Sequence, residues 1–476
     1  MSVAADRPSA APPALGLLRR LGPLDAAAIV VSNVIGGGIF FVPVLVAKLT
    51  PSAWAMLGVW LFGGALAFIG AMAYAELATM RPRAGGEYVY LRAAYGRPMA
   101  FISGWTSFVA GFSGSIAAGA VALADYLGRF IPSAADRTPL IGIPHTSLVL
   151  TPQGLVAISV IWMLSAIHLH GAGRVVHNLL AGLKVSALAA FIALGLTLGR
   201  GSFGHLSSSH ELPVPGANWL LALIPVMFSY SGWNAAAYVA EEIRDPVRNL
   251  PRALAMGTLA VVIVYLALNV LFLFSMPVAE LAMLPDGRFT DIIAERLFGF
   301  VAGNVLAIFT IVSIAAGVSA MVLAGPRVYF AMARDGVFFA SAARVHPTYR
   351  TPVRAIAAQA VWSSVLVLSG TLAQIVTYTG FAVVLFSGVA VLAVFVLRRK
   401  EPDAVRPFRA LGYPFAPGFF VVCSFLMVVN EVWQNPVPSL AGVAVIAAGV
   451  PVYLAVARRR ATPGTTSASS ASASSE

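Results

Sequence analysis

The sequence consists largely of apolar runs of about 20 residues or more, separated by short charged segments, and these runs limit the fold more than any other feature. A helix of that length crosses the hydrocarbon core of a bilayer, which is roughly 30 Å thick. Hydrophobic residue types make up 59% of the 476 residues and charged types only 11%, too little charge to cover a soluble protein of this size. The sequence therefore predicts an all-α polytopic membrane protein with about 12 transmembrane helices.

The apolar segments begin near residues 25, 54, 98, 153, 175, 218, 252, 301, 353, 373, 414 and 439. If the N-terminus is cytoplasmic, the inner segments hold 24 of the 31 lysines and arginines and the outer segments hold 6. Cytoplasmic loops of membrane proteins carry such an excess. The formal net charge of +12 therefore indicates topology and not a nucleic-acid partner. We expect a multi-pass protein of the bacterial inner or plasma membrane with both termini cytoplasmic.

Two of the segments contain residues that interrupt a helix. The first reads "SNVIGGGIFFVP" from residue 32, and the sixth reads "PVMFSYSGWN" from residue 225. Interrupted helices at matching places in two halves indicate an inverted-repeat transporter with a binding site at the midplane. The sequence predicts a 5+5 inverted repeat with broken helices 1 and 6. The repeats cover residues 23–199 and 218–400, helices 11 and 12 lie in 401–460, and cytoplasmic tails cover 1–22 and 461–476, the latter disordered.

A broken helix inside a membrane leaves backbone groups unpaired unless they line a cavity or bind a ligand. A new half-helix after Gly37 and Gly38 would present free N–H groups to a carboxylate. The carbonyls near Phe228 and Ser231 could accept hydrogen bonds from an ammonium. The two sites together fit an α-amino acid. The alternative, glycines that permit close helix packing, is typical of GxxxG spacing and not of three consecutive glycines.

Lys184 lies about ten residues into the fifth apolar segment, near the middle of the bilayer, where an ionisable residue is costly and indicates function. Its ammonium could replace a coupling cation by coordinating carbonyls near Asn33 to Gly36, with Ser313 as a hydroxyl partner. The alternative is a lysine that extends to the inner interface.

Several motifs in these segments resemble those of the amino acid–polyamine–organocation superfamily, and within it the L-type amino acid transporter and bacterial amino acid exchanger branch. "NVIGGGIF" resembles the first-helix motif G-S-G-I-F. "AYAELATMRPRAGGEYVYL" resembles the loop between the second and third helices, and "FSYSGWN" with "EEIRDPVRNLPRAL" resembles the sixth helix and the following loop. The resemblance covers residues 20 to 460 and implies a twelve-helix carrier that works by alternating access.

The resemblance also implies roles for single residues. Phe228 matches an aromatic residue that closes over bound substrate, and Lys184 matches a lysine that replaces sodium in sodium-independent members. Asn234 occupies a position where several proton-coupled relatives carry an acid, and an amide does not titrate, which favours exchange or facilitated transport over proton symport. Gly37 departs from the family, which often has serine there. Tyr378 is a candidate for the outer gate.

We therefore expect a secondary active transporter of L-amino acids, with sodium-independent exchange of neutral amino acids as the first hypothesis. The alternatives are a proton-coupled permease, a carrier of cationic amino acids or polyamines, and a non-transporting amino acid sensor. An enzyme is not expected, because no nucleophile–base pair or metal cluster is apparent. The substrate-binding candidates are Asn33, Ile35, Gly36, Gly37, Gly38, Phe228, Ser229, Ser231, Trp233 and Asn234, and the coupling candidates are Lys184 and Ser313.

The remaining expectations concern charged loops and partners. Glu76 and Glu87 flank the basic loop "RPRAGGEY", and we expect both to form structural ion pairs. The expected partners are an amino acid substrate and the lipid bilayer, without nucleic acid, metal or cofactor. The single cysteine, Cys423, lies in an apolar segment, so no disulfide-linked ancillary subunit is expected. The protein is expected to be a monomer or a weak homodimer.

Overall fold

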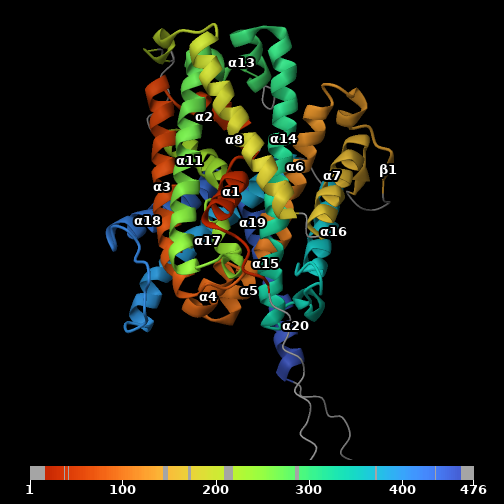
Figure 1. The fold of residues 1–476 in the computed structure, drawn as a ribbon, viewed down its shortest axis with the longest axis vertical. Coiled ribbons are helices and arrows are strands. Elements are labelled where there is room, and N and C mark those ends of the chain that lie inside the picture. Colours follow the sequence, from red (N-terminus) through yellow and green to blue (C-terminus); the bar gives the residue numbers. More distant parts are fainter. Residues whose placement is uncertain are drawn as a thin grey trace, which may run out of the picture.

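The computed structural model describes residues 17–36, 38–40, 42–142, 148–169, 173–207, 209, 218–284, 289–369, 372–434 and 436–461. In this part of the chain the protein is almost entirely helical (Figure 1). The strands there are β1 (Ile141–Gly142) and β2 (Val149–Leu150), which pair antiparallel in one short hairpin. The predicted all-α polytopic fold is confirmed.

The helices of the first half are α1 (Pro23–Val34), η1 (Gly38–Phe40), α2 (Val42–Leu49), α3 (Ala53–Met80), α4 (Glu87–Tyr95), α5 (Arg97–Thr106), η2 (Ser107–Gly111), α6 (Phe112–Leu127), η3 (Pro132–Ala135), α7 (Pro152–Leu169), α8 (Gly173–Leu198) and η4 (Phe203–Ser207). Those of the second half are α9 (Asn218–Tyr230), α10 (Ala235–Tyr238), η5 (Ala240–Glu242), α11 (Pro246–Ser275), α12 (Val278–Ala282), α13 (Phe289–Phe298), α14 (Phe300–Ala324), α15 (Pro326–Arg334), η6 (Ala340–Ala343), α16 (Val353–Ser369) and α17 (Leu372–Lys400). The helices α18 (Phe415–Gln434), α19 (Pro436–Ala447) and α20 (Gly449–Ala461) follow.

The described residues contain eight helical segments that are long and apolar enough to cross a membrane. These lie in α3, α5 to α6, α7, α8, α11, α14 to α15, α17 and α18. Four shorter apolar helical segments lie in α1, α9, α16 and α19 to α20. Long and short segments together coincide with the twelve segments that the sequence predicted. The two predicted broken helices, α1 and α9, are among the short ones, because each ends partway through its span.

Burial shows which spans form the centre of the molecule. In α11 and in the segment that includes α14, 61% of the most apolar window is buried, but in α8 and α18 only 22% is buried. α11 and α14 therefore form the interior, whereas α8 and α18 present most of their side chains outward, where lipid would contact them. Figure 1 shows α1 near the middle, between α8 and α11, with α13 at one end and α4 and α5 toward the other.

The packing of the two halves follows the same plan. In the first span, α1 packs against α8 of span 5 and α11 of span 7. In the sixth span, α9 packs against α17 of span 10 and α3 of span 2, which are the equivalent spans of the other half. Likewise α6 packs against α16 and α17, and α14 packs against α7 and α8. Because each half has an odd number of spans, the second half starts on the opposite side of the membrane. The contacts therefore have the pattern of a 5+5 inverted repeat, and the predicted repeat boundaries stay predictions.

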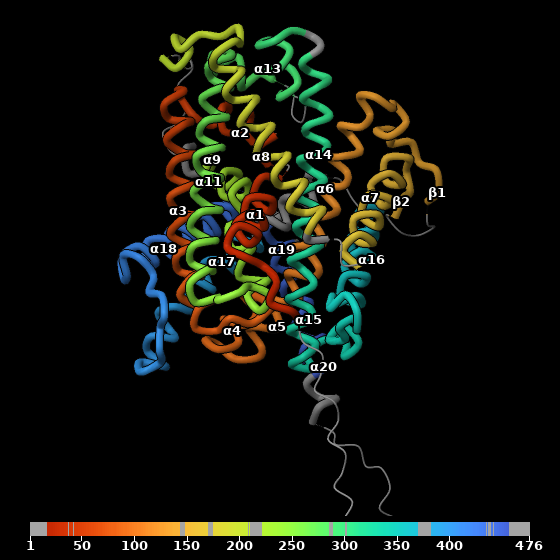
Figure 2. The backbone as a smooth tube through the Cα atoms, in the orientation of Figure 1, coloured from red at the N-terminus to blue at the C-terminus, as the bar shows by residue number. Residues whose placement is uncertain are grey.

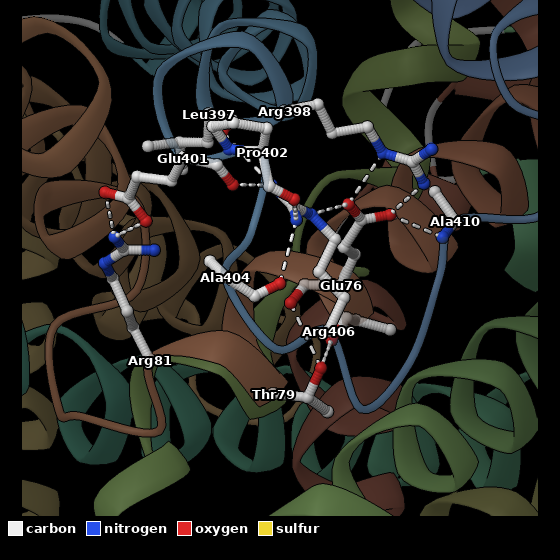
Figure 3. A network of polar contacts seen from close by, with 11 residues as sticks. Glu76, Thr79, Arg81, Leu397, Arg398, Glu401, Pro402, Ala404, Arg406 and Ala410 are labelled. Carbon is white, nitrogen blue, oxygen red and sulfur yellow. Dashed lines mark hydrogen bonds and ion pairs between the residues drawn. The ribbon is translucent and has the colours of Figure 1, made fainter.

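Helix ends and ion pairs fix the positions of the spans. The Ser52 hydroxyl accepts a hydrogen bond from the Ala55 amide at 3.2 Å and caps α3. The other end of α3 carries Glu76, which is 1% exposed and pairs with Arg398 at 2.7 Å and with Arg406 at 3.5 Å (Figure 3). This cluster attaches the end of α17 and the loop after it to α3. The predicted structural ion pair of Glu76 is confirmed.

Candidate functional site

The first span is interrupted between Val34 and Val42. α1 ends at Val34, Ile35 has φ −73° and ψ 75°, and the amide of Gly36 donates a hydrogen bond to the Val34 carbonyl at 2.7 Å. The chain resumes in the short turn η1, and α2 begins at Val42. In Figure 2, α1 lies in the middle of the molecule and α2 lies toward the end where α13 is found. The predicted break is confirmed, and Gly37 lies outside the described residues.

The sixth span is interrupted between Tyr230 and Ala235. Gly232 has φ +100°, a conformation that favours glycine, and its carbonyl accepts a hydrogen bond from the Ala235 amide at 2.9 Å. A Cβ atom on Gly232 would lie 2.9 Å from the Cβ of Asn33. The second predicted break is therefore also confirmed, and its backbone touches the end of α1.

The two breaks are in contact at a second point, and a phenol bridges them. A Cβ atom on Gly38 would lie 3.0 Å from the Cα of Ser229, so no side chain larger than hydrogen fits there without movement. The hydroxyl of Tyr265, from α11, lies 2.8 Å from the Val34 carbonyl oxygen and 3.1 Å from that of Ser229. Tyr265 is fully buried, and its hydroxyl lies within hydrogen-bond distance of a carbonyl at the end of each interrupted helix.

Lys184 extends from α8 to the first break. Its ammonium donates to the carbonyl oxygen of Ile35 and lies 3.4 Å from that of Ser32, and the side chain is fully buried. A cation at the carbonyl end of a helix is favourable because those oxygens carry partial negative charge. The contact lies at the carbonyls where the sequence predicted it.

Ser313 lies on α14 and is fully buried, and in the described part of the chain its hydroxyl has no hydrogen-bond partner. One turn later, a Cβ atom on Gly317 would lie 3.4 Å from the Ser32 carbonyl oxygen, so α14 packs on the same break. A partnership between Ser313 and Lys184 stays a prediction.

A cavity of about 80 Å³ lies next to the breaks. Asn33 from the first break and Ser231, Gly232 and Asn234 from the second form one part of its wall. Thr106, Ser107 and Ser115 line it from α5, η2 and α6. Apolar side chains complete it, namely Phe112, Met321 and Phe386. The wall thus combines backbone from two broken helices with small hydroxyls and a few apolar groups, as ligand sites generally do.

Glu87 also lines the cavity, and here the sequence-based expectation is wrong. No cation lies within ion-pair distance of its carboxylate among the described residues, because Arg81 pairs with Glu401 and Arg92 pairs with Asp335. Instead Oε1 of Glu87 accepts hydrogen bonds from the Tyr74 hydroxyl at 2.6 Å and from the Asn234 amide at 2.8 Å.

The backbone before Glu87 explains this orientation. Gly85 and Gly86 have φ of +115° and +49°, and the Gly85 amide donates to the Tyr238 carbonyl at 3.1 Å. A Cβ atom on Gly86 would lie 2.5 Å from the Tyr238 ring, so the loop can approach α10 only with glycine at this position. The start of α4 is thereby held against α10, and Glu87 faces inward.

Comparison with known protein families gives a match over residues 21–456 to the family described as amino acid permease. The chain belongs to the amino acid permease family. As a permease it falls in the amino acid–polyamine–organocation superfamily, as the motifs predicted.

Curated relatives of this permease carry transporter names. The chain is 29% identical to the serine/threonine exchanger SteT of Bacillus subtilis, over 94% of this chain and 98% of that protein. It is 29% identical to large neutral amino acids transporter small subunit 2 of Mus musculus, over 92% of this chain and 81% of the relative. It is 28% identical to Asc-type amino acid transporter 1 of Homo sapiens, over 92% and 81%. The permease is therefore a multi-pass membrane protein of an amino acid transporter family.

The remaining candidate residues of this permease surround the cavity without being part of its described wall. Ile35 and Gly36 form the first break behind the wall, and Phe228 lies partly buried just before the second. Trp233 is buried and packs edge-on against Tyr74, with ring centroids 4.8 Å apart. Substrate-binding roles for these residues stay predictions, and the side chain of Tyr378 lies outside the described residues.

Sequence reasoning missed Tyr265 and gave Glu87 the wrong role. Tyr265 is a phenol inside a long apolar span, and its polar hydroxyl in that setting was a usable signal. Glu87 was noticed, but its position in a basic loop favoured an ion pair. The consecutive glycines before it were the signal for a tight approach to another helix.

Proposed function

We propose that this permease exchanges small neutral L-amino acids across the membrane, independently of sodium, by alternating access. The observation that carries the proposal is the contact of the Lys184 ammonium with the carbonyls of the first break. A fixed cation at these carbonyls leaves no need for a mobile one to satisfy them. A cycle without a bound sodium ion takes no energy from a sodium gradient, which favours exchange.

The dimensions of the cavity favour a small substrate. About 80 Å³ is several times the roughly 10–15 Å³ that a cavity needs to hold one water, but it is small for a ligand site. The volume therefore favours the smaller amino acids, such as alanine, serine and threonine. The hydroxyls of Thr106, Ser107 and Ser115 could bond a hydroxyl on the substrate side chain. A carrier name for serine and threonine among the relatives supports the same choice.

The proposed binding mode uses the backbone of both breaks. The substrate carboxylate takes hydrogen bonds from backbone amides beyond Gly36, where the first span resumes, and the substrate ammonium donates to carbonyl oxygens of the second break. Because Asn33 and Gly232 are in contact, the two breaks are close enough for one small zwitterion to bind both of them. The orientation follows the positive-inside rule, with both termini cytoplasmic in a bacterial inner or plasma membrane. We also propose a monomer or weak homodimer without a disulfide-linked subunit, since Cys423 lies within α18.

Counterflow in proteoliposomes tests the proposal. Purified protein is reconstituted with unlabelled L-serine inside, and uptake of labelled L-serine is measured without any ion gradient. We expect uptake that requires internal L-serine and is unchanged when sodium is replaced by N-methylglucamine. The counterflow measurement is then repeated with each of the twenty amino acids.

Other results would refute parts of the proposal. Uptake that requires a sodium gradient would overturn the role given to Lys184. Binding of an amino acid without counterflow of any of the twenty would indicate a sensor, and counterflow confined to arginine, lysine or polyamines would overturn the neutral substrate class.

A further inference from the structure

The cavity wall includes the carboxyl group of Glu87, which has no role in the proposed exchange. Among the described residues that line the cavity, Glu87 is the only one with an ionisable carboxyl, and it is 7% exposed. Its Oε1 atom holds hydrogen bonds from Tyr74 and Asn234. The group is therefore both buried and open to whatever occupies the cavity.

The titratable groups that face Glu87 are phenols and not cations. Tyr74 comes from α3, Tyr90 from α4 and Tyr238 from α10. Asn234 bridges the site by donating to Glu87 at 2.8 Å and to the Tyr238 hydroxyl at 3.2 Å. None of these groups supplies the positive charge that would hold a buried carboxylate ionised.

Charged residues on the other helices packed against α4 have contacts other than Glu87 or lie at helix ends. α15 contributes Arg327, which binds Glu242 at 2.8 Å, and Arg334, which binds Glu241 at 2.9 Å; Asp335, just after α15, binds Arg92.

α17 contributes Arg398, which binds Glu76, the exposed Arg399, and Lys400, which donates to the Ala94 carbonyl near the far end of α4. On α5 the basic residue is Arg97, at the first position of that helix.

Burial without a cation favours the neutral acid. Burial raises the pKa of the Glu87 carboxyl above its ordinary value, although the hydrogen bonds from Tyr74, Tyr238 and Asn234 act in the opposite direction. A bound amino acid displaces water from the cavity and brings its own charged groups near this carboxyl, so substrate binding and protonation of Glu87 influence each other.

A short series of contacts connects the carboxyl to both breaks. Asn234, the partner of Glu87, follows Gly232 by two residues and precedes α10 directly. Gly232 in turn touches Asn33 at the end of α1. A change in the hydrogen bonds of Glu87 thus reaches the second break through one side chain and the first break through one backbone contact.

We propose that Glu87 is a proton-binding site of the substrate cavity, and that the affinity for a neutral amino acid depends on whether this carboxyl holds a proton. The proton is exchanged with cytoplasmic water. The part of the proposal that concerns substrate affinity rests on the proposed function, and it adds that this affinity depends on pH. It places a titratable group beside Asn234, whose amide cannot titrate.

Infrared difference spectroscopy of the purified protein tests proton binding without any substrate. Spectra between about pH 5 and pH 9 should contain the carbonyl stretch of a protonated carboxylic acid that titrates above the ordinary range for glutamate. The band should be missing in Glu87→Gln, which keeps the shape of the neutral acid, and present in Glu280→Gln, a control on an exposed ion pair. An unchanged band in folded Glu87→Gln overturns the proposal.

A second variant covers the case in which Glu87→Gln does not fold. Tyr74→Phe removes the 2.6 Å hydrogen bond that stabilises the ionised form, while Glu87 remains. Because a hydrogen bond to a charged group is strong, the midpoint of the band should move upward by about one pH unit. A midpoint that does not move, or moves downward, overturns the proposal.

Substrate affinity supplies the independent test of linkage. Around the midpoint, the affinity for L-serine in wild type should change with pH, by up to about tenfold per pH unit, and in Glu87→Gln it should be flat. Equal slopes in both proteins overturn the linkage. If the infrared band behaves as expected but no neutral amino acid shows counterflow, the proton site stands and the proposed transport function fails, so the two failures are distinguishable.

Discussion

Replacement of Lys184 by methionine tests the fixed cation at the first break. Methionine is similar to lysine in length and carries no charge, so it fills the buried space but leaves the Ile35 carbonyl without its ammonium partner. A hydrogen bond to a charged group contributes about 1.5–3 kcal/mol. Since about 1.4 kcal/mol is a factor of ten, the ordered conformation of the break should become about 10 to 150 times less favoured.

The same change removes the cost of burying a charge. Transfer of an ammonium out of water is expensive, and its loss offsets the unpaired carbonyl in the free energy of folding. We therefore expect Lys184→Met to remain folded, with a monodisperse elution profile and a melting temperature within a few degrees of wild type. The loss should appear in transport, where L-serine counterflow should fall at least about tenfold.

Lys400→Met is the matched control for this experiment. Lys400 also donates to a backbone carbonyl, that of Ala94 at 2.8 Å, but it lies at the end of α17 and away from both breaks. Its replacement should leave counterflow within about twofold of wild type. If folded Lys184→Met protein exchanges L-serine as fast as this control, the ammonium has no part in transport and the reasoning is refuted.

Three further changes test the geometry of the breaks. Gly232→Ala should abolish counterflow and lower the melting temperature, because Gly232 combines φ of +100° with a close contact to Asn33. The control Gly299→Ala, with φ of +92° but open space around it, should cost only about 1–2 kcal/mol of backbone strain. Equal effects of the two changes would argue against the contact. Tyr265→Phe leaves two carbonyls without their hydroxyl and should slow counterflow with little change in thermal stability, which a melting curve beside the transport assay would check. Phe228→Ala should weaken substrate retention far more than Tyr378→Ala, and similar dissociation rates of bound L-serine in both would contradict the gate assignment.

The spans and their interruptions could be predicted because they depend on local sequence. Apolar runs of helix length determine where the chain crosses the membrane, and consecutive glycines or crowded polar residues determine where a helix cannot continue. Lys184 could be predicted for a related reason, since a charge inside such a run must find oxygen partners. The carbonyls of the adjacent broken helix were the oxygens that the sequence could supply.

The wall of the cavity could not be predicted in the same way, because it depends on which helices meet. Thr106, Ser107 and Ser115 are ordinary polar residues in an apolar span until α6 packs beside α17 and α14. From the sequence alone, Glu87 is expected to be a loop residue that pairs with its basic neighbours. Only the approach of Gly86 to Tyr238, between segments about 150 positions apart in the chain, turns its carboxyl inward.

The two ionisable side chains that approach the breaks differ in what they contact. Lys184 binds backbone carbonyls of the first break directly, so it can stabilise that break without a mobile metal cation. Glu87 acts on the second break through Asn234 and can exchange its proton with water. A ligand shifts a conformational equilibrium only by its difference in affinity between the two states. A proton on Glu87 is such a ligand, so a dependence of exchange on a proton gradient can enter at the second break.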